Sequence, residues 1–153
     1  MRRLITLYLL GLALGDSFSA SAAIGRVSKV LPHFLDAQGR HSLSPSLFDR
    51  DAYQVKLRQH PELRSGIRFD VNWRVRSVTS ATFKLKVELR GIAKGNLPRL
   101  KSLEQEVKGG VGARWTGLTL GGDDYKDFGE VTAWRVTLWD GEQMIGEEKS
   151  FLW

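Results

Sequence analysis

The chain contains no cysteine, and only four prolines, three histidines and two methionines occur among its 153 residues. Without cysteine it can form neither disulfide bonds nor thiolate metal sites, and it has no thiol nucleophile. A hydrophobic fraction of 42% is too high for a disordered chain. The length suits one domain and is too short for a barrel enzyme of about 250 residues. We therefore expect a single domain held together by a packed apolar core.

The first residues have the order of an export signal. Arg2-Arg3 precede an uncharged, leucine-rich run over 4–14, which is too short for the roughly 20 residues of a membrane-spanning helix. A polar stretch and the small residues Ala20 and Ala22 follow, so the pattern predicts cleavage after position 22, with a buried N-terminal helix as the alternative. The expected products are a signal peptide, 1–22, and an exported domain, 23–153, in the periplasm or outside the cell.

Two segments alternate apolar and polar residues without a break, over 67–76 and 83–90. This period of two predicts half-buried strands, and slipping either by one residue would bury four or five of its polar or charged side chains. A third strand is predicted over 131–139, where β-formers are frequent. Asp140-Gly141 then predicts a hairpin turn and a return strand over 143–153.

Weaker strand patterns cover 26–35, 101–108 and 114–120. About seven short strands separated by glycine- and asparagine-containing turns predict an all-β, immunoglobulin-like antiparallel sandwich. One segment departs from this pattern. Ser44-Pro45 is a helix-start signal and His60-Pro61 a stop signal, which together predict a helical insertion over 47–59 at an open end or edge of the sandwich. A helical turn is also predicted over 123–129, with aspartate as its cap and glycine as its stop.

Two resemblances follow from these segments. Leu118-Thr119-Leu120, a Gly-Gly pair and Tyr125 before a long strand resemble the tyrosine corner that precedes strand F in fibronectin type III and related immunoglobulin-like domains, and Trp73 resembles their core tryptophan. The stretches 31–36, 44–54 and 134–141 are similar to short exported bacterial proteins of no assigned function. These resemblances imply an exported sandwich, and they imply no activity.

Catalytic chemistry is poorly represented. His33 and His41 flank a predicted turn, where together with Asp36 they would suit zinc, although packed or surface histidines are the simpler interpretation. An acidic cluster would suit calcium, but its spacing is not that of an EF-hand and a solvated helix cap explains it: Asp123, Asp124, Asp127 and Glu130. Neither a serine-hydrolase elbow nor a nucleotide-binding glycine loop is present. We therefore expect no catalytic, cofactor-binding or metal site.

Charge is distributed unevenly along a chain whose formal net charge is +6. Residues 24–101 contain 16 basic and 6 acidic side chains, whereas residues 102–153 contain 5 and 10. The solvent sides of the two clearest strands, with one tryptophan beside the hairpin, form a candidate binding surface: Arg68, Arg74, Arg76, Lys84, Lys86, Arg90 and Trp139. In an immunoglobulin topology these strands belong to opposite sheets, which would divide the surface, and the acidic C-terminal third would be able to neutralise it.

The tryptophans suggest a second kind of surface. If Trp134, Val136 and Leu138 face the core, then Arg135, Thr137 and Trp139 face solvent, so that Trp139, and with it Trp115, would suit stacking against sugar rings. Structural packing is the simpler role for both tryptophans.

These patterns favour an exported, non-catalytic sandwich that binds or assembles with an envelope partner, either a protein or a polysaccharide. A carbohydrate- or anionic-polymer-binding module is the alternative, and an envelope-polymer hydrolase the less favoured one. Nucleic acid is not expected as a partner of an exported protein.

Overall fold

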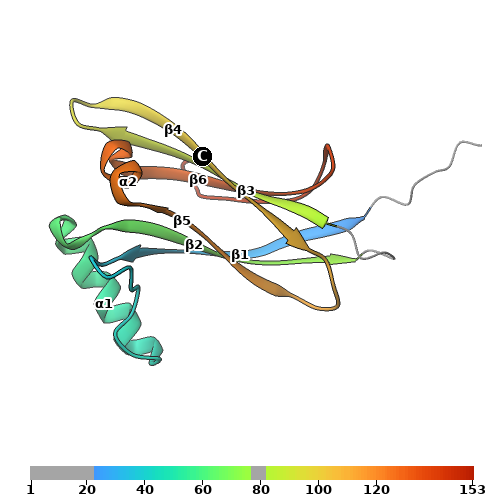
Figure 1. Ribbon diagram of the computed structural model, residues 1–153, viewed down its shortest axis with the longest axis horizontal. Coiled ribbons are helices and arrows are strands. Elements are labelled where there is room, and N and C mark those ends of the chain that lie inside the picture. The colour runs from blue at the N-terminus through green and yellow to red at the C-terminus, as the bar shows by residue number, and fades with distance from the viewer. Residues whose placement is uncertain (1–22, 77–81) are drawn as a thin grey trace, which may run out of the picture.

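Seven strands form two antiparallel sheets that pack face to face in residues 23–76 and 82–153, the parts of the chain that this computed structural model describes (Figure 1). The predicted signal peptide lies outside the described residues. The first sheet has the order β1-β2-β5 and the second the order β4-β3-β6-β7. The bounds are β1 Ile24–Leu35, β2 Gly66–Arg76, β3 Thr82–Ala93, β4 Leu97–Lys108, β5 Arg114–Gly121, β6 Glu130–Asp140 and β7 Gln143–Lys149.

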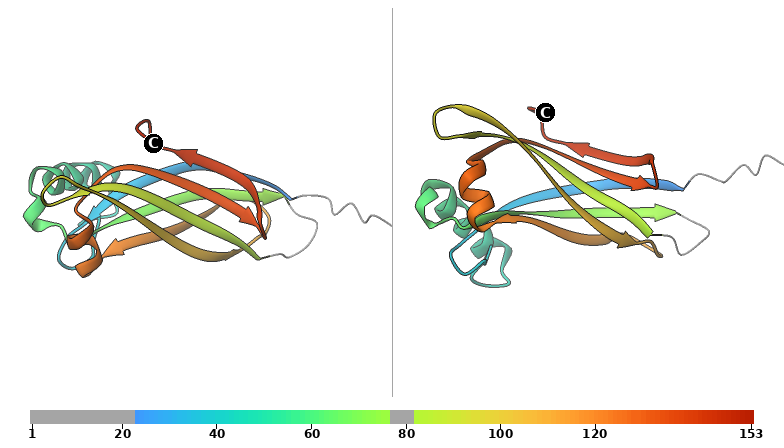
Figure 2. Two further views of the ribbon diagram at one scale, coloured as in Figure 1. Left: turned by 90° about the horizontal axis from the view of Figure 1, so that it is seen from above. Right: turned by 45° about the horizontal axis from the view of Figure 1, so that its top comes forward.

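The predicted all-β, immunoglobulin-like sandwich is thus confirmed. The strands divide into three and four because β4 pairs with β3 rather than with β5. Constant-type immunoglobulin domains instead divide into four and three, with the fourth strand in the first sheet. The two layers are clear in the views of Figure 2, where the three-stranded sheet lies beside the twisted four-stranded one. The consequence for function is that β2 and β3 present their polar residues on opposite sides of the molecule.

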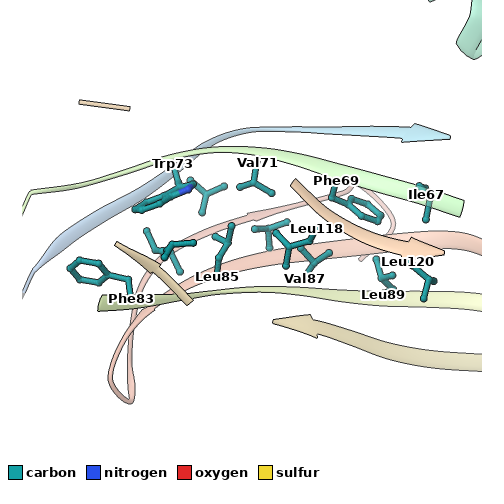
Figure 3. Close-up of a cluster of buried hydrophobic side chains, with 14 of the residues drawn as sticks. Ile67, Phe69, Val71, Trp73, Phe83, Leu85, Val87, Leu89, Leu118 and Leu120 are labelled. Atoms are coloured by element: carbon teal, nitrogen blue, oxygen red, sulfur yellow. The ribbon is translucent and has the colours of Figure 1, made fainter. Parts of the chain in front are cut away.

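The core lies between β2 and β3, as their alternation predicts. Seven inward-facing side chains from these two strands are at most 2% exposed: Phe69, Val71, Trp73, Phe83, Leu85, Val87 and Leu89 (Figure 3). The indole N–H of Trp73 donates a 2.9 Å hydrogen bond to Thr116 Oγ1 on β5, which satisfies its one polar atom inside the sandwich. The core position expected of Trp73 is confirmed.

The helical insertion is α1, Leu47–Gln59, as predicted, followed by one 3₁₀ turn over Pro61–Leu63. Its capping side chain is that of Ser46, which accepts a hydrogen bond from Asp49 N, whereas Ser44 of the start signal bonds to the Asp49 carboxylate. Figure 1 shows α1 at one end of the sandwich, beside β1 and β2. In the described part of the chain, no helix has both the length and the apolar character that crossing a bilayer requires.

A buried glutamine attaches α1 to the sheet. Gln54 is 2% exposed, and its amide accepts a 2.8 Å hydrogen bond from Phe34 N while donating to the carbonyl oxygens of Phe34 and His41. The two bonds to Phe34 occupy backbone groups of β1, which is an edge strand of its sheet, and so protect this end of the edge from pairing with another chain.

Two local predictions are wrong. The second helix, α2, spans Gly122–Phe128, but its N-cap is Gly121 and no side chain caps it, whereas Gly129 does end it with φ 82°. The return strand β7 ends at Lys149 rather than at 153. The chain then turns, and the Trp153 ring lies under the Arg90 guanidinium at 4.1 Å from its centroid, a cation–π contact that draws the end of the chain away from the strand.

The first prediction concerns Gly91, a position at which β3 approaches α2 closely. A Cβ atom there would collide with the Phe128 ring and would lie 2.7 Å from the carbonyl oxygen of Glu130. Gly91→Ala is therefore expected to lower the free energy of unfolding by about 1–3 kcal/mol, because the buried Phe128 ring and the backbone must move. Urea unfolding measures this effect.

Gly121→Ala is the matched control, since the nearest atom to its added Cβ, a methyl carbon of Thr119, lies 3.7 Å away and its φ is −141°. Equal stability losses in the two variants would contradict the close packing at Gly91.

Candidate binding surface

The structure divides the candidate binding surface between the two sheets. Arg68, Arg74 and Arg76 project from β2 on the outer side of the three-stranded sheet. Lys84, Lys86 and Arg90 project from β3 on the outer side of the four-stranded sheet, where Trp139 of β6 is the cross-strand partner of Lys84. The seven residues therefore do not form one continuous surface, which agrees with the division that an immunoglobulin topology predicts.

Acidic side chains neutralise the four-stranded face. β4 pairs with β3 on one side and β7 with β6 on the other, so that glutamates from the acidic C-terminal third are brought beside the cations. The resulting ion pairs are Lys84–Glu104 at 3.8 Å, Lys86–Glu104 at 3.8 Å and Arg135–Glu147 at 2.7 Å. Within β3, Glu88 adds a pair with Lys86 at 3.4 Å. Arg90 instead packs on Trp153. This face has little cationic character left for a ligand.

The residues of β6 that the sequence analysis placed toward solvent are less exposed than expected. Thr137 is fully buried, and Arg135 and Trp139 are half-buried, although all three were expected to face solvent. The indole N–H of Trp139 donates a 2.8 Å hydrogen bond to Thr137 Oγ1, so that its ring leans along the sheet and covers its neighbour. Trp139 is consequently not an open platform for sugar stacking.

The outer side of the three-stranded sheet has a different character. We use the term cationic face for six residues at the end of this sheet remote from α1: Arg26, Lys29, Asn72, Arg74, Arg76 and Trp115. The four basic side chains are exposed, and Trp115 is 55% exposed. In the register of the sheet, Arg26 is directly opposite Arg74, while Asn72 lies between Lys29 on one side and Trp115 on the other.

The basic residues of the cationic face have no acidic partner in the described parts of the chain. Ten ion pairs of lysine or arginine and two histidine–carboxylate contacts occur there, and none includes Arg26, Lys29, Arg74 or Arg76. Two like charges directly opposite each other on an antiparallel pair destabilise a sheet. The Arg26–Arg74 pair therefore imposes a cost on folding that a bound anion would remove. A surface lined by one sign of charge also concentrates ions of the opposite sign.

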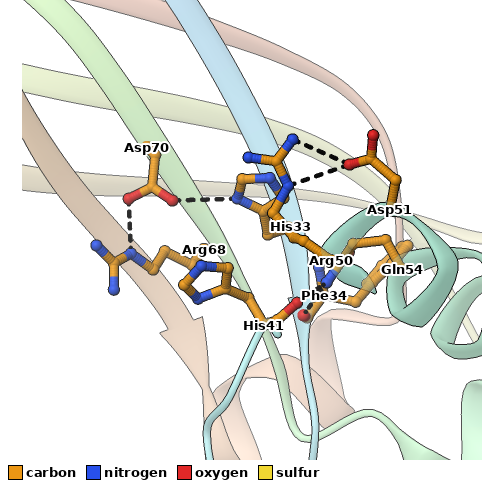
Figure 4. A network of polar contacts seen from close by, with 8 residues as sticks. All are labelled: His33, Phe34, His41, Arg50, Asp51, Gln54, Arg68 and Asp70. Atoms are coloured by element: carbon orange, nitrogen blue, oxygen red, sulfur yellow. Dashed lines mark hydrogen bonds and ion pairs between the residues drawn. The ribbon is translucent and has the colours of Figure 1, made fainter. Parts of the chain in front are cut away.

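A polar cluster occupies the other end of the same sheet (Figure 4). Asp70 lies 3.1 Å from His33 Nδ1 and accepts a 2.7 Å hydrogen bond from Arg68 Nε. Burial raises the pKa of Asp70, but the bonds from His33 and Arg68 outweigh this effect and keep it below its ordinary value. Arg68 is therefore engaged by Asp70 and differs from the unpaired arginines Arg74 and Arg76.

The histidines do meet, but not as the zinc site considered from the sequence. His33 and His41 stack with ring centroids 5.2 Å apart and planes inclined by 25°. Asp36 does not join them. Its carboxylate accepts hydrogen bonds from the backbone N–H groups of Gln38 and Arg40, from Arg40 Nε and from Tyr53 Oη. Burial raises the pKa of Asp36, yet these donors lower it overall to about 2.

No group of three or more histidine, aspartate or glutamate side chains converges as metal ligands within residues 23–76 and 82–153. In the acidic cluster considered for calcium, Asp124 forms a 2.8 Å ion pair with Lys101, and Asp123 lies 3.7 Å from Lys126. Both carboxylates are thus engaged by cations.

The second prediction concerns pH. Burial, and next the facing His33, lower the pKa of His41 below 6.5; Arg68 and Arg50 act in the same direction, and Asp70 opposes them. As the pH falls through 6.5, the unfolded chain binds a proton at His41 that the folded chain resists, so the free energy of unfolding decreases. His41→Gln is expected to remove this part of the pH dependence in urea unfolding between about pH 5 and pH 8.

His60→Gln is the control, because His60 is exposed beside Glu62. A pH profile that stays unchanged in His41→Gln would contradict the assignment.

Sequence reasoning missed Arg26 and Lys29. A β-bulge between Val27 and Lys29 breaks the alternation of β1. Without the bulge, Lys29 would share the inward face of Val27, whereas with it both basic residues point outward. The sequence contains one sign of this bulge. If β1 alternated without a break from an inward-facing Val27, Lys29 would lie in the core, where an unpaired lysine is not expected.

Comparison of the chain with protein-family models, with curated proteins and with solved structures found no match. The geometry of the chain's own residues therefore carries the functional assignment.

Proposed function

We propose that this protein is an exported, non-catalytic β-sandwich that binds an anionic envelope partner through the cationic face. The observation that carries the proposal is the unneutralised set of exposed cations on the three-stranded sheet, with Arg26 opposite Arg74. Rigid strands hold these side chains at fixed spacing, which suits recognition of a repeating negative charge. An anionic polymer is thus the preferred partner over an uncharged one.

Two carboxylates that are enclosed by hydrogen bonds, those of Asp36 and Asp70, are unsuited to the acid step of hydrolysis. A glycoside hydrolase needs a carboxylic acid whose pKa is raised so that it can donate a proton. Asp36 and Asp70 are both held in the opposite direction, with lowered pKa values, by bonds to cationic and neutral donors. Their carboxylates stabilise local structure at the α1 end of the sheet.

The third prediction tests the cationic face directly. The double variant Arg26→Gln with Arg74→Gln is expected to reduce affinity for an acidic polysaccharide such as polygalacturonate at least tenfold, because two phosphate- or carboxylate-binding groups are lost from one spot. Titration calorimetry at low and high salt measures the effect. The wild-type affinity is expected to fall with rising salt, as for exposed charges in general.

The matched control carries the same change in net charge on the other sheet. Lys84→Gln with Lys86→Gln removes two cations that are paired with Glu104 and Glu88. We expect this variant to bind as the wild type does. Equal losses in the two double variants would attribute binding to net charge alone, and no loss in either would exclude the cationic face.

Export forms part of the proposal and gives the fourth prediction. Arg2-Arg3, the leucine-rich run over 4–14 and the small residues before position 23 support processing by a signal peptidase. When the full chain is expressed in a bacterium, the protein recovered from the periplasm or medium is expected to begin at Ala23, as determined by N-terminal sequencing. Recovery from the cytoplasm with residues 1–22 retained would contradict export.

A further inference from the structure

Trp115 is the tryptophan that the described structure leaves most open to solvent. Its 55% exposure contrasts with the fully enclosed Trp73 and with Trp134, Trp139 and Trp153, each of which is half-buried. Trp115 lies on β5, directly opposite Asn72 of β2, and its diagonal neighbours on β2 are Arg74 and Asp70, of which Asp70 is engaged by Arg68. Diagonal neighbours on one face of a sheet lie about 7–8 Å apart, within reach of long and aromatic side chains.

The surroundings of Trp115 are polar. Across the sheet, the row through Trp115 continues to Asn72 and then to Lys29, and the next row contains Arg74 and Arg26. Most of the larger exposed apolar side chains gather elsewhere, with Leu43, Leu47, Phe48 and Val55 on or beside α1 and Leu97 and Leu100 on β4. Near the cationic face, Ile24, opposite Arg76, and Val111, in the loop before β5, are also exposed. The centre of a protein–protein interface is usually apolar, with several aromatic or aliphatic residues. A single aromatic ring among cations and an amide does not match that composition.

The same composition matches an acidic sugar. The face of an indole carries partial negative charge and attracts the C–H groups on the flat side of a sugar ring. A guanidinium group binds a carboxylate through two parallel hydrogen bonds, and the cross-strand pair of arginines offers two such groups side by side. Asn72 adds an amide: its Nδ2 donates to the Arg114 carbonyl at 3.5 Å, and its oxygen is engaged in no hydrogen bond among the described residues.

The dimensions of the cationic face suit more than one sugar residue. Neighbouring strands lie about 4.8 Å apart, so the row from Lys29 through Asn72 to Trp115 spans about 10 Å across three strands. The arginine row lies two residues farther along β2, about 7 Å away. Ring-binding and carboxylate-binding groups are thus adjacent but separate, as they would be for a polymer with one carboxylate on each ring.

We infer that the ligand of the cationic face is a polysaccharide of uronic acids. One of its sugar rings stacks on Trp115, and Arg74 and Arg26 bind carboxylates of the polysaccharide. This inference rests on the proposed function, which it narrows from anionic partners in general to one class. A chain of phosphates would satisfy the arginines equally well but has no ring to place on Trp115. Uronic acid polymers and phosphate chains can therefore be distinguished by whether Trp115 contributes to the binding affinity.

The fifth prediction uses three defined probes: polygalacturonate, inorganic polyphosphate and neutral dextran. Trp115→Ala is expected to weaken polygalacturonate binding at least tenfold in titration calorimetry while changing polyphosphate binding less than twofold. Trp115→Phe is expected to restore most of the polygalacturonate affinity, because it restores an aromatic face. Dextran is expected not to bind, because it has no carboxylate for the arginines.

Trp139→Ala, on the opposite sheet, is the control for loss of a tryptophan, and thermal unfolding of every variant checks that the fold is retained. Equal loss of both polyanions in Trp115→Ala, or loss of neither, would overturn the inference. If Trp115→Ala gave either of these results but the double variant Arg26→Gln with Arg74→Gln still abolished polyanion binding, the proposed function would hold and the assignment of a uronic acid ligand would fail. If neither polyanion bound the wild type, both the proposed function and the inference would fail.

Discussion

The burial of alternate residues on β2 and β3 is the constraint on which the rest of the structure depends. Phe69, Val71 and Trp73 of one strand face Phe83, Leu85 and Val87 of the other across the core. Because side chains alternate, each charged residue on these strands is forced to the outside of its own sheet. The basic residues are thereby divided into two sets that lie on opposite sides of the molecule.

The two sets then meet different neighbours. On the four-stranded sheet, β4 supplies Glu104 and β7 supplies Glu147, so the cations there form ion pairs. The neighbours of β2 are β1 and β5, and at the end of the sheet away from α1 neither strand carries an acidic residue. Because the acidic residues of the C-terminal third pair with cations on the four-stranded sheet, the outer side of the three-stranded sheet keeps the excess of positive charge. This difference, rather than the net charge, makes one face suited to an anion.

The insertion between β1 and β2, which contains α1, covers the end of the three-stranded sheet opposite the cationic face. Gln54 attaches α1 to the backbone of β1, and the loop before α1 places His41 against His33. The same end of the sheet holds Asp70, which engages Arg68. Cations near α1 therefore stabilise the fold, whereas those at the far end remain available to a ligand.

The sequence by itself determined the strands, the helix over 47–59 and the burial of Trp73, because these depend on local periodicity, turn residues and caps. It also predicted that β2 and β3 would separate their arginines and lysines. It did not identify Arg26, Lys29 or the paired state of Lys84 and Lys86. Those features depend on a bulge in β1 and on which strands lie side by side. Only the tertiary structure decides such neighbours, since cross-strand pairing joins residues that are distant along the chain.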